Sequence, residues 1–125
     1  MHRSRIAVVL IDHPASAYDE AGAFWAAAAG STLVPEDDTY ASVTVLPGGV
    51  KLEAQRLGGD TPARIHLDIE TDDVGAEVKR LVALGATVVE DREGYVILND
   101  PGGLVFCVVP VQTGSDFDAY AVTWE

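Results

Sequence analysis

The stretch ARIHLDIETDDVGAEVKRLVALGATVVE, residues 63–90, decides the fold because it holds a strand pattern and a helix pattern in succession. Polar and apolar residues alternate from Arg64 to Glu70, which is the period of a half-buried strand. Apolar residues then recur at the spacing of an amphipathic helix, at Val74, Val78, Leu81 and Val82. Asp73 suits the positive start of that helix, and Gly85 suits its end. The stretch therefore predicts a strand followed by an amphipathic helix.

The first half of the chain repeats this pattern. Residues 6–14 match residues 64–72 at a constant distance of 58 positions, and a Pro-Gly-Gly turn occurs in each half, at Pro47 and at Pro101. Glycine permits the positive φ of a tight hairpin, so both turns predict β-hairpins. The helix pattern of the first half is formed by Ala17, Ala21, Phe24 and Trp25.

Each half thus reads as a strand, a helix and three further strands, over residues 5–57 and 64–109. One such module cannot bury its sheet alone, so we expect two tandem β-α-β-β-β modules to pair around one core as a single α+β domain. The tail, residues 111–125, lies outside the repeat. We expect its aromatic side chains to pack on the body or on a second chain: Phe117, Tyr120 and Trp124.

The composition indicates one soluble domain and opposes several kinds of partner. The chain has 125 residues, 48% of them hydrophobic, and a formal net charge of −12. That charge opposes binding to nucleic acid and to anionic membranes, which both need a basic surface. The single cysteine, Cys107, excludes an intrachain disulfide, and the apolar run from Ile6 to Ile11 is too short for a signal segment or a membrane span. We therefore expect a cytoplasmic protein.

The tandem repeat, with HLDIETDDVGAEVKRLVALGA at 66–86 and LNDPGGLVFCVV at 98–109, resembles the vicinal oxygen chelate superfamily. It is most similar to the glyoxalase-like and bleomycin-resistance-type domains, and the likeness extends to Pro110. The resemblance implies a curved mixed sheet around a cleft, with helices on its outer face. It leaves the activity open, because this fold serves lyases, dioxygenases, epimerases, thiol transferases and binders without catalysis.

The resemblance also implies where a metal would bind, on the first and last strands of each half. His66 stands at the first-strand position of the second half and Cys107 at its last-strand position. The repeat pairs them with Val8 and Glu53. Val8 cannot ligate a metal, and Cys107 replaces the usual carboxylate, so we expect no catalytic metal. If a divalent metal is bound, the expected ligands are Glu53 and His66, with Cys107 as a third.

Strand alternation adds polar neighbours to this set. Asp68 shares a face with His66, while Lys51 and Gln55 share a face with Glu53. One interpretation is that these side chains anchor a small molecule in an otherwise apolar site. The other is that His66 is a structural residue whose imidazole pairs with Glu53 or Asp68.

These observations favour a small-molecule binding protein of the glyoxalase or bleomycin-resistance type, whose partly apolar ligand directs a donor or a cation at Glu53. The alternative is a divalent-metal-dependent lyase or isomerase that uses Glu53 and His66. In a third interpretation, the cleft serves a protein partner or another subunit. We expect a homodimer, since two-module proteins of this kind often associate. His2 is expected in a loose terminus, away from any site.

Overall fold

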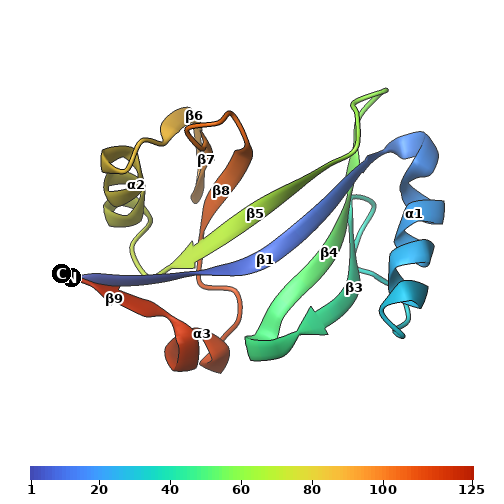
Figure 1. Cartoon of the computed structure of the whole chain (residues 1–125), viewed down its shortest axis with the longest axis horizontal. Helices are drawn as coiled ribbons and strands as arrows, with labels where there is room; N and C mark the ends of the chain where they lie inside the picture. The colour runs from blue at the N-terminus through green and yellow to red at the C-terminus, as the bar shows by residue number, and fades with distance from the viewer. The chain divides into compact units, whose positions relative to one another are not determined.

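The computed structural model describes all 125 residues, and its elements confirm the order β-α-β-β-β in both halves (Figure 1). The strands are β1 (His2–Pro14), β2 (Val34–Pro35), β3 (Tyr40–Leu46), β4 (Val50–Leu57), β5 (Arg64–Thr71), β6 (Thr87–Arg92), β7 (Tyr95–Asn99), β8 (Val105–Pro110) and β9 (Val122–Trp124). The helices are α1 (Ala15–Ala28), α2 (Val74–Ala83) and α3 (Ser115–Tyr120), with a 3₁₀ turn, η1, at Pro47–Gly49.

The strands form one mixed sheet in the order β2-β3-β4-β1-β5-β8-β7-β6, and β9 pairs with β1. β1 runs parallel to β4, and β5 runs parallel to β8. The other adjacent pairs within each half are antiparallel. The chain is therefore an α+β protein, as the repeat predicts.

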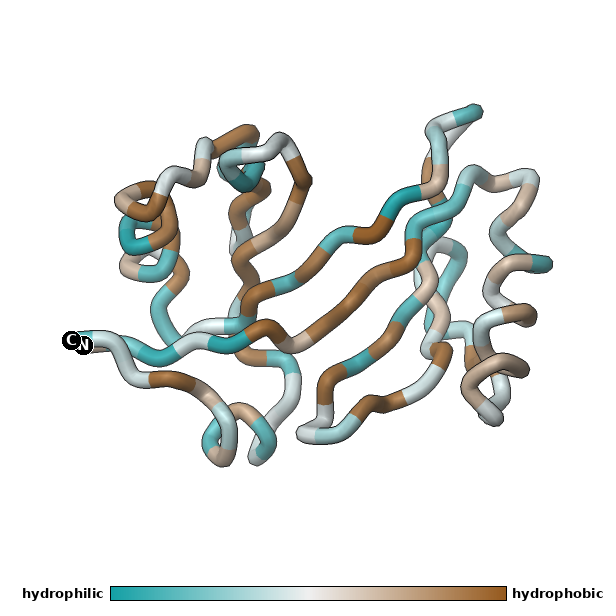
Figure 2. Tube along the Cα trace, in the orientation of Figure 1, coloured by the Kyte–Doolittle hydropathy of each residue, from teal (hydrophilic) through white to brown (hydrophobic).

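The chain forms two compact units. Residues Val8–His66 make up one, which we call the α1 unit, and Met1–Ala7 with Leu67–Glu125 make up the other, the α2 unit. Strands β1 and β5 each contribute residues to both units. Figure 2 shows the alternation of polar and apolar residues along β5 that the sequence predicts.

In the α1 unit, helix α1 packs on β3 and β4, although with a different face from the one predicted. The core residues of this unit are Tyr18, Ala26, Ala41, Val43 and Ala54, with Leu33 and Leu52 packed against them. The prediction that Phe24 and Trp25 face the core is wrong, because their side chains are 62% and 41% exposed. Gly22 lies on the buried face instead, where an added Cβ would come within 3.2 Å of Leu33. The helix is rich in alanine on all sides, so apolar spacing alone does not identify its inner face.

In the α2 unit, helix α2 packs on β7 and β8 as its spacing predicts. The core residues are Val96, Leu98, Phe106 and Val108, and the residues packed against them are Leu67, Ile69, Val74, Val78, Leu81 and Ala86. Val82 departs from the prediction, since its side chain is 44% exposed. Asp73 caps the helix by accepting a hydrogen bond from the Ala76 amide at 3.0 Å. Gly85, with φ of +117°, follows the helix end.

Both Pro-Gly-Gly turns join antiparallel strands, which confirms the two predicted hairpins. The first connects β3 to β4 through η1, and Gly48 and Gly49 there have φ of +79° and +73°. The second connects β7 to β8, and Asp100 stabilises it by accepting hydrogen bonds from the amides of Gly102 and Leu104, both at 2.8 Å.

The C-terminal tail packs back on its own unit, as expected. Phe117 is buried, and the indole Nε1 of Trp124 donates a hydrogen bond to Ser4 Oγ at 2.8 Å. Tyr120 is largely exposed. The expectation that His2 is loose is wrong, because β9 pairs with the start of β1 and His2 Nε2 lies 2.7 Å from Glu77 Oε1. None of the helices combines the length and the apolar character that crossing a membrane requires.

Candidate functional site around His66

One face of the α1 unit carries most of the side chains selected from the sequence. The parallel register of β1 and β4 places Val8 beside Lys51 and Leu10 beside Glu53. Gln55 is the partner of a further β1 residue, Asp12, and adjacent residues in register point to the same side of a sheet. Val8, Leu10 and Asp12 are buried, whereas the three β4 side chains are half-buried.

The opposite face of these strands is the apolar one. Leu52 and Ala54 pack in the core of the α1 unit beneath helix α1. This arrangement confirms the alternation predicted for residues 50–56. It also assigns a purpose to each face, since α1 covers one side and the polar side chains lie on the other.

Asp12 is the partner of His66 in this unit. The Asp12 carboxylate is completely buried, and its Oδ2 atom lies 2.6 Å from His66 Nδ1. Arg64 Nε approaches the same oxygen at 3.4 Å from a side chain that is 45% exposed. The second oxygen, Asp12 Oδ1, is buried and has no hydrogen-bond donor.

The contact with Asp12 determines which nitrogen of His66 can react. At 2.6 Å from a carboxylate, Nδ1 carries the proton and donates it in a hydrogen bond. In the neutral imidazole, Nε2 is then the nitrogen that accepts a hydrogen bond or binds a metal ion. A carboxylate behind a histidine is the arrangement that orients metal-binding and proton-accepting histidines in proteins.

Sequence reasoning did not select Asp12. It lies at the end of the apolar run, directly before His13 and Pro14, where an acidic residue is typical of a turn. The signal that could have found it is the repeat, because the residue 58 positions later is Glu70. Glu70 is likewise a buried carboxylate on a central strand.

Glu70 has a complete set of hydrogen-bond donors in the α2 unit. Its Oε1 accepts from the backbone amides of Gln112 at 2.7 Å and Thr113 at 3.0 Å. Its Oε2 accepts from Arg5 Nε at 2.8 Å and from the Thr113 hydroxyl. Burial would raise the pKa of Glu70, but hydrogen bonds from Arg5, Thr113 and Gln112 together hold that pKa below its ordinary value.

Strands β5 and β8 bring together a second set of predicted residues. Asp68 lies opposite Cys107 in the parallel ladder, and His66 precedes Asp68 by two residues on the same strand. One ligand atom from each of these three side chains lies within 4.8 Å of the others. Cys107 is half-buried.

The donor set of His66, Asp68 and Cys107 fits a divalent cation of borderline softness. It offers an imidazole nitrogen, a carboxylate oxygen and a sulfur, and three protein ligands with an open position are typical of catalytic zinc. A thiolate favours zinc or cobalt over magnesium. The hydrogen bond from His66 Nδ1 to Asp12 would orient the ring for ligation through Nε2.

Comparison with known proteins identifies the family. The family model described as glyoxalase-like domain matches residues 8–109. The chain belongs to the glyoxalase-like domain family. No curated protein sequence matches the chain.

Solved structures with the fold of this glyoxalase-like domain include a Mn(II)-bound glyoxalase from Novosphingobium aromaticivorans, with 22% identity and a TM-score of 0.62 over 88% of this chain. The chain spans only 40% of that protein. A hypothetical protein from Bacillus halodurans has 10% identity and a TM-score of 0.62, over 87% of this chain and 95% of its own. A methylmalonyl-CoA epimerase has 13% identity and a TM-score of 0.58, over 86% of this chain and 94% of its own. At these identities the likeness establishes the shared fold.

Proposed function

We propose that this glyoxalase-like domain binds a small, partly apolar molecule at the β1–β4 face around His66, without a catalytic metal, as binding proteins of the bleomycin-resistance type do. The observation that supports this most is the pair formed by Asp12 and His66. A buried carboxylate fixes the imidazole in one orientation, which is the preorganisation that a binding site needs.

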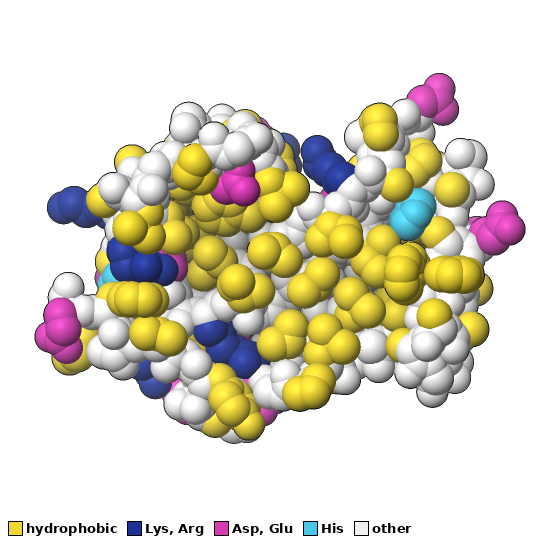
Figure 3. Space-filling model, in the orientation of Figure 1, with side chains coloured by type: hydrophobic (Ala, Val, Ile, Leu, Met, Phe, Trp, Pro, Cys, Tyr) yellow, Lys and Arg dark blue, Asp and Glu magenta, His cyan; other side chains and the backbone are white.

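The same face offers both kinds of contact that such a ligand requires. Glu53, Gln55 and Lys51 supply polar groups on β4. Val45 of β3 is the register partner of Lys51 and is 63% exposed, so an apolar side chain lies directly beside the polar ones. Figure 3 shows one face of the molecule, on which hydrophobic side chains gather over the strands with no acidic side chain among those over β3 and β4. A few polar anchors amid apolar surface are typical of small-molecule sites.

The charges of this face favour a ligand that donates hydrogen bonds or carries a positive charge. Asp12 and Glu53 are carboxylates on adjacent strands, and the cationic side chains of this unit beside them are Lys51 on β4 and Arg64, whose Nε lies 3.4 Å from Asp12 Oδ2. The net charge of −12 adds a long-range attraction for cations. A ligand with an ammonium or hydroxyl group directed at Glu53 should therefore bind more tightly than a ligand with a carboxylate there.

Calorimetric titration with three probes that share one ring tests this proposal: benzylamine, benzyl alcohol and benzoate. We expect affinity to fall in that order, and Glu53→Gln to weaken benzylamine by about tenfold while leaving benzyl alcohol nearly unchanged. Glu36→Gln, which removes the same charge from an exposed loop, is the matched control. Strongest binding of benzoate, or improved binding in Glu53→Gln, would refute the role of Glu53.

A second candidate function is a divalent-metal-dependent lyase or isomerase. The grouping of His66, Asp68 and Cys107 favours it, and Glu53 is the further ligand expected from the repeat. A metal bound there would supply a Lewis acid that polarises a substrate carbonyl. His66 would ligate through Nε2, while Asp12 would hold the ring from behind through Nδ1.

Titration with Co²⁺ separates the two candidate functions. A metal enzyme of this kind gives a charge-transfer absorption from the Cys107 thiolate to cobalt, and Cys107→Ser abolishes it. Elemental analysis of protein purified without a chelating tag provides the second readout. Saturable, stoichiometric binding by both methods would support the metal-dependent enzyme, and its absence would support the metal-free binding protein.

We also propose that the protein is a cytoplasmic homodimer that binds neither nucleic acid nor membranes. The acidic composition supports the proposal that it binds neither nucleic acid nor membranes. Because Phe117 and Trp124 are engaged within their own unit, the tail leaves mainly Tyr120 for a contact between copies. Sedimentation at micromolar concentration tests the dimer, and a species of monomer mass alone would contradict it.

A further inference from the structure

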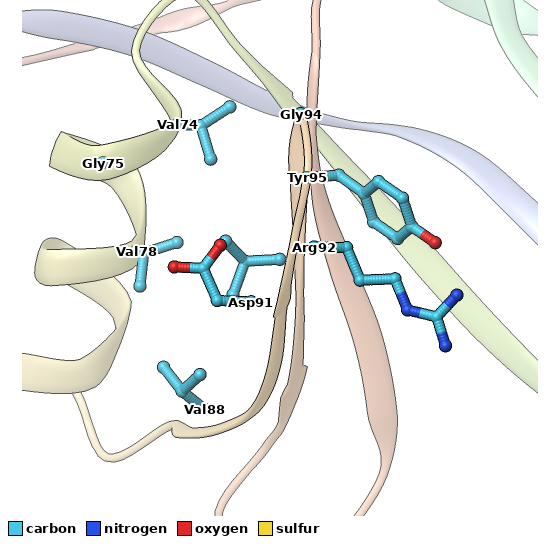
Figure 4. A pocket seen from close by; sticks show the side chains of 9 residues that line it. Val74, Gly75, Val78, Val88, Asp91, Arg92, Gly94 and Tyr95 are labelled. Carbon is cyan, nitrogen blue, oxygen red and sulfur yellow. The ribbon is translucent and has the colours of Figure 1, made fainter.

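The α2 unit contains a hollow that the site around His66 does not involve. It lies between helix α2 and the edge strand β6 and has a volume of about 420 Å³. Figure 4 shows Val74 and Val78 on the helix side and Val88 on the strand side, with the Asp91 carboxylate directed at the helix between them. Gly75 and Gly94 border the hollow without side chains. We call it the α2–β6 groove.

A β-bulge places Asp91 in this groove. Val88 pairs with Leu98 and Asp91 pairs with Val96, so both side chains lie on the face that packs against α2. The register shift between Val88 and Glu90 inserts one residue into β6. Without that extra residue, strict alternation would have turned Glu90 toward the helix in place of Asp91. Bulges are frequent next to functional sites because they redirect side chains in this way.

The two acidic residues that follow the bulge differ in their partners. Glu90 points away from the helix, and its Oε2 lies 3.0 Å from Arg92 Nη2. The Asp91 side chain makes no hydrogen bond or ion pair with the rest of the chain. Figure 4 shows the Arg92 guanidinium on the other side of the β6–β7 hairpin. The groove thus combines an apolar wall of valines with one carboxylate that no protein cation neutralises.

We propose that the α2–β6 groove is a second binding site, for a small primary amine with an aliphatic body. The methylene groups would lie along Val74, Val78 and Val88, and the ammonium group would meet Asp91. The acidic chain raises the local concentration of cations and disfavours anions. This site is separate from the one around His66, so neither proposal depends on the other.

Titration of ¹⁵N-labelled protein with hexylammonium, followed by amide chemical shifts, locates the binding. We expect saturable shifts at Val74, Val78 and Val88, with a dissociation constant of about 1 mM, which is typical for so few ligand atoms. Asp91→Asn should weaken hexylammonium about fivefold and leave 1-hexanol unchanged, since the loss is one charge contact to an exposed carboxylate. Glu93→Gln, which removes the same charge from the adjacent turn, should alter neither probe.

Three results would overturn this inference. The first is the absence of saturable shifts at the groove residues. The second is equal weakening by Asp91→Asn and Glu93→Gln, which would indicate general attraction of cations to an acidic chain. The third is a set of shifts confined to Glu53, His66 and their neighbours, which would assign the amine to the other site. Because the readout is resolved by residue, failure here leaves the test of the His66 site intact.

Discussion

Asp12 and Glu70 occupy equivalent places in the two halves of the chain, 58 positions apart, yet their surroundings differ. Both side chains are completely buried on a central strand. Glu70 accepts hydrogen bonds with both oxygens, including two from backbone amides and one from Arg5. Asp12 uses one oxygen for His66 and Arg64 and leaves the other without a donor.

The difference separates a structural carboxylate from a functional one. A buried carboxylate with a full set of hydrogen-bond donors rigidifies the fold. The protein loses much of its stability when one of those partners is removed. A buried oxygen without a donor has a desolvation cost that the fold does not offset, and such sites concentrate where function requires them. We infer that Glu70 holds the α2 unit together, while Asp12 is retained because it orients His66.

The largest expected effect is the loss of stability when Glu70, the structural carboxylate, is replaced. Glu70→Gln should lower the free energy of unfolding by about 3 kcal/mol or more, because it breaks the buried ion pair between Arg5 Nε and Glu70 Oε2 at 2.8 Å. Urea unfolding measures this loss. Glu90→Gln, on the exposed edge strand, is the control and should stay within about 0.5 kcal/mol of the wild type. A similarly small effect of Glu70→Gln would remove the distinction between the two carboxylates.

Replacing the arginine beside each carboxylate should give the second largest difference in stability. Arg5→Gln removes a buried guanidinium 2.8 Å from Glu70, so we expect a loss of about 2–3 kcal/mol. Arg64→Gln removes a side chain that is 45% exposed and 3.4 Å from Asp12, so we expect less than about 0.5 kcal/mol. Thermal unfolding of both variants gives the comparison. Equal losses would mean that Arg64 supports Asp12 as firmly as Arg5 supports Glu70.

Acid should weaken the α2 unit through Glu70 and Glu77. Burial opposes ionisation of both, but hydrogen bonds from Arg5 and Thr113 to Glu70, and from Arg80 and His2 to Glu77, lower each pKa below the ordinary 4.5. Their contribution to stability is therefore complete above pH 4.5 and is lost as the pH falls through the lowered values. Urea midpoints measured from pH 7 downward should decline mainly below pH 4.5. The decline should be shallower in Glu70→Gln, and an unchanged slope would contradict this assignment.

Asp12→Asn should change stability far less than Glu70→Gln does. The amide oxygen can still accept the hydrogen bond from His66, and the amide nitrogen replaces an oxygen that has no donor. We expect a change of less than about 1 kcal/mol in the free energy of unfolding, together with weaker ligand or metal binding. A loss as large as that of Glu70→Gln would show that Asp12 is structural as well.

The sequence predicts the elements of this fold well because the repeat and the strand alternation are local patterns. The two hairpins, the cap at Asp73 and the faces of β4 and β5 are all correct. The face of α1 is wrong because Phe24 and Trp25 lie in an alanine-rich helix, where the close packing of Gly22 decides the orientation.

The candidate site is harder to predict because its key contacts join residues far apart in the chain. His66 and Asp68 follow from alternation, but the partner of His66 lies 54 positions earlier, at Asp12. The position of His2 depends on pairing with β9, which forms only from the tail. A pattern within one segment contains neither contact, so only the comparison of the two halves points to Asp12.

The position of the proton on His66 tests the central claim most directly. Long-range ¹H–¹⁵N correlation spectra of the imidazole, recorded on the wild type at mildly alkaline pH, identify which nitrogen is protonated. We predict a proton on Nδ1, held by Asp12, and an unprotonated Nε2, with this preference lost when Asp12 is replaced by alanine. A proton on Nε2 in the wild type, or the same spectrum in Asp12→Ala, would contradict the claim that Asp12 prepares His66 for function.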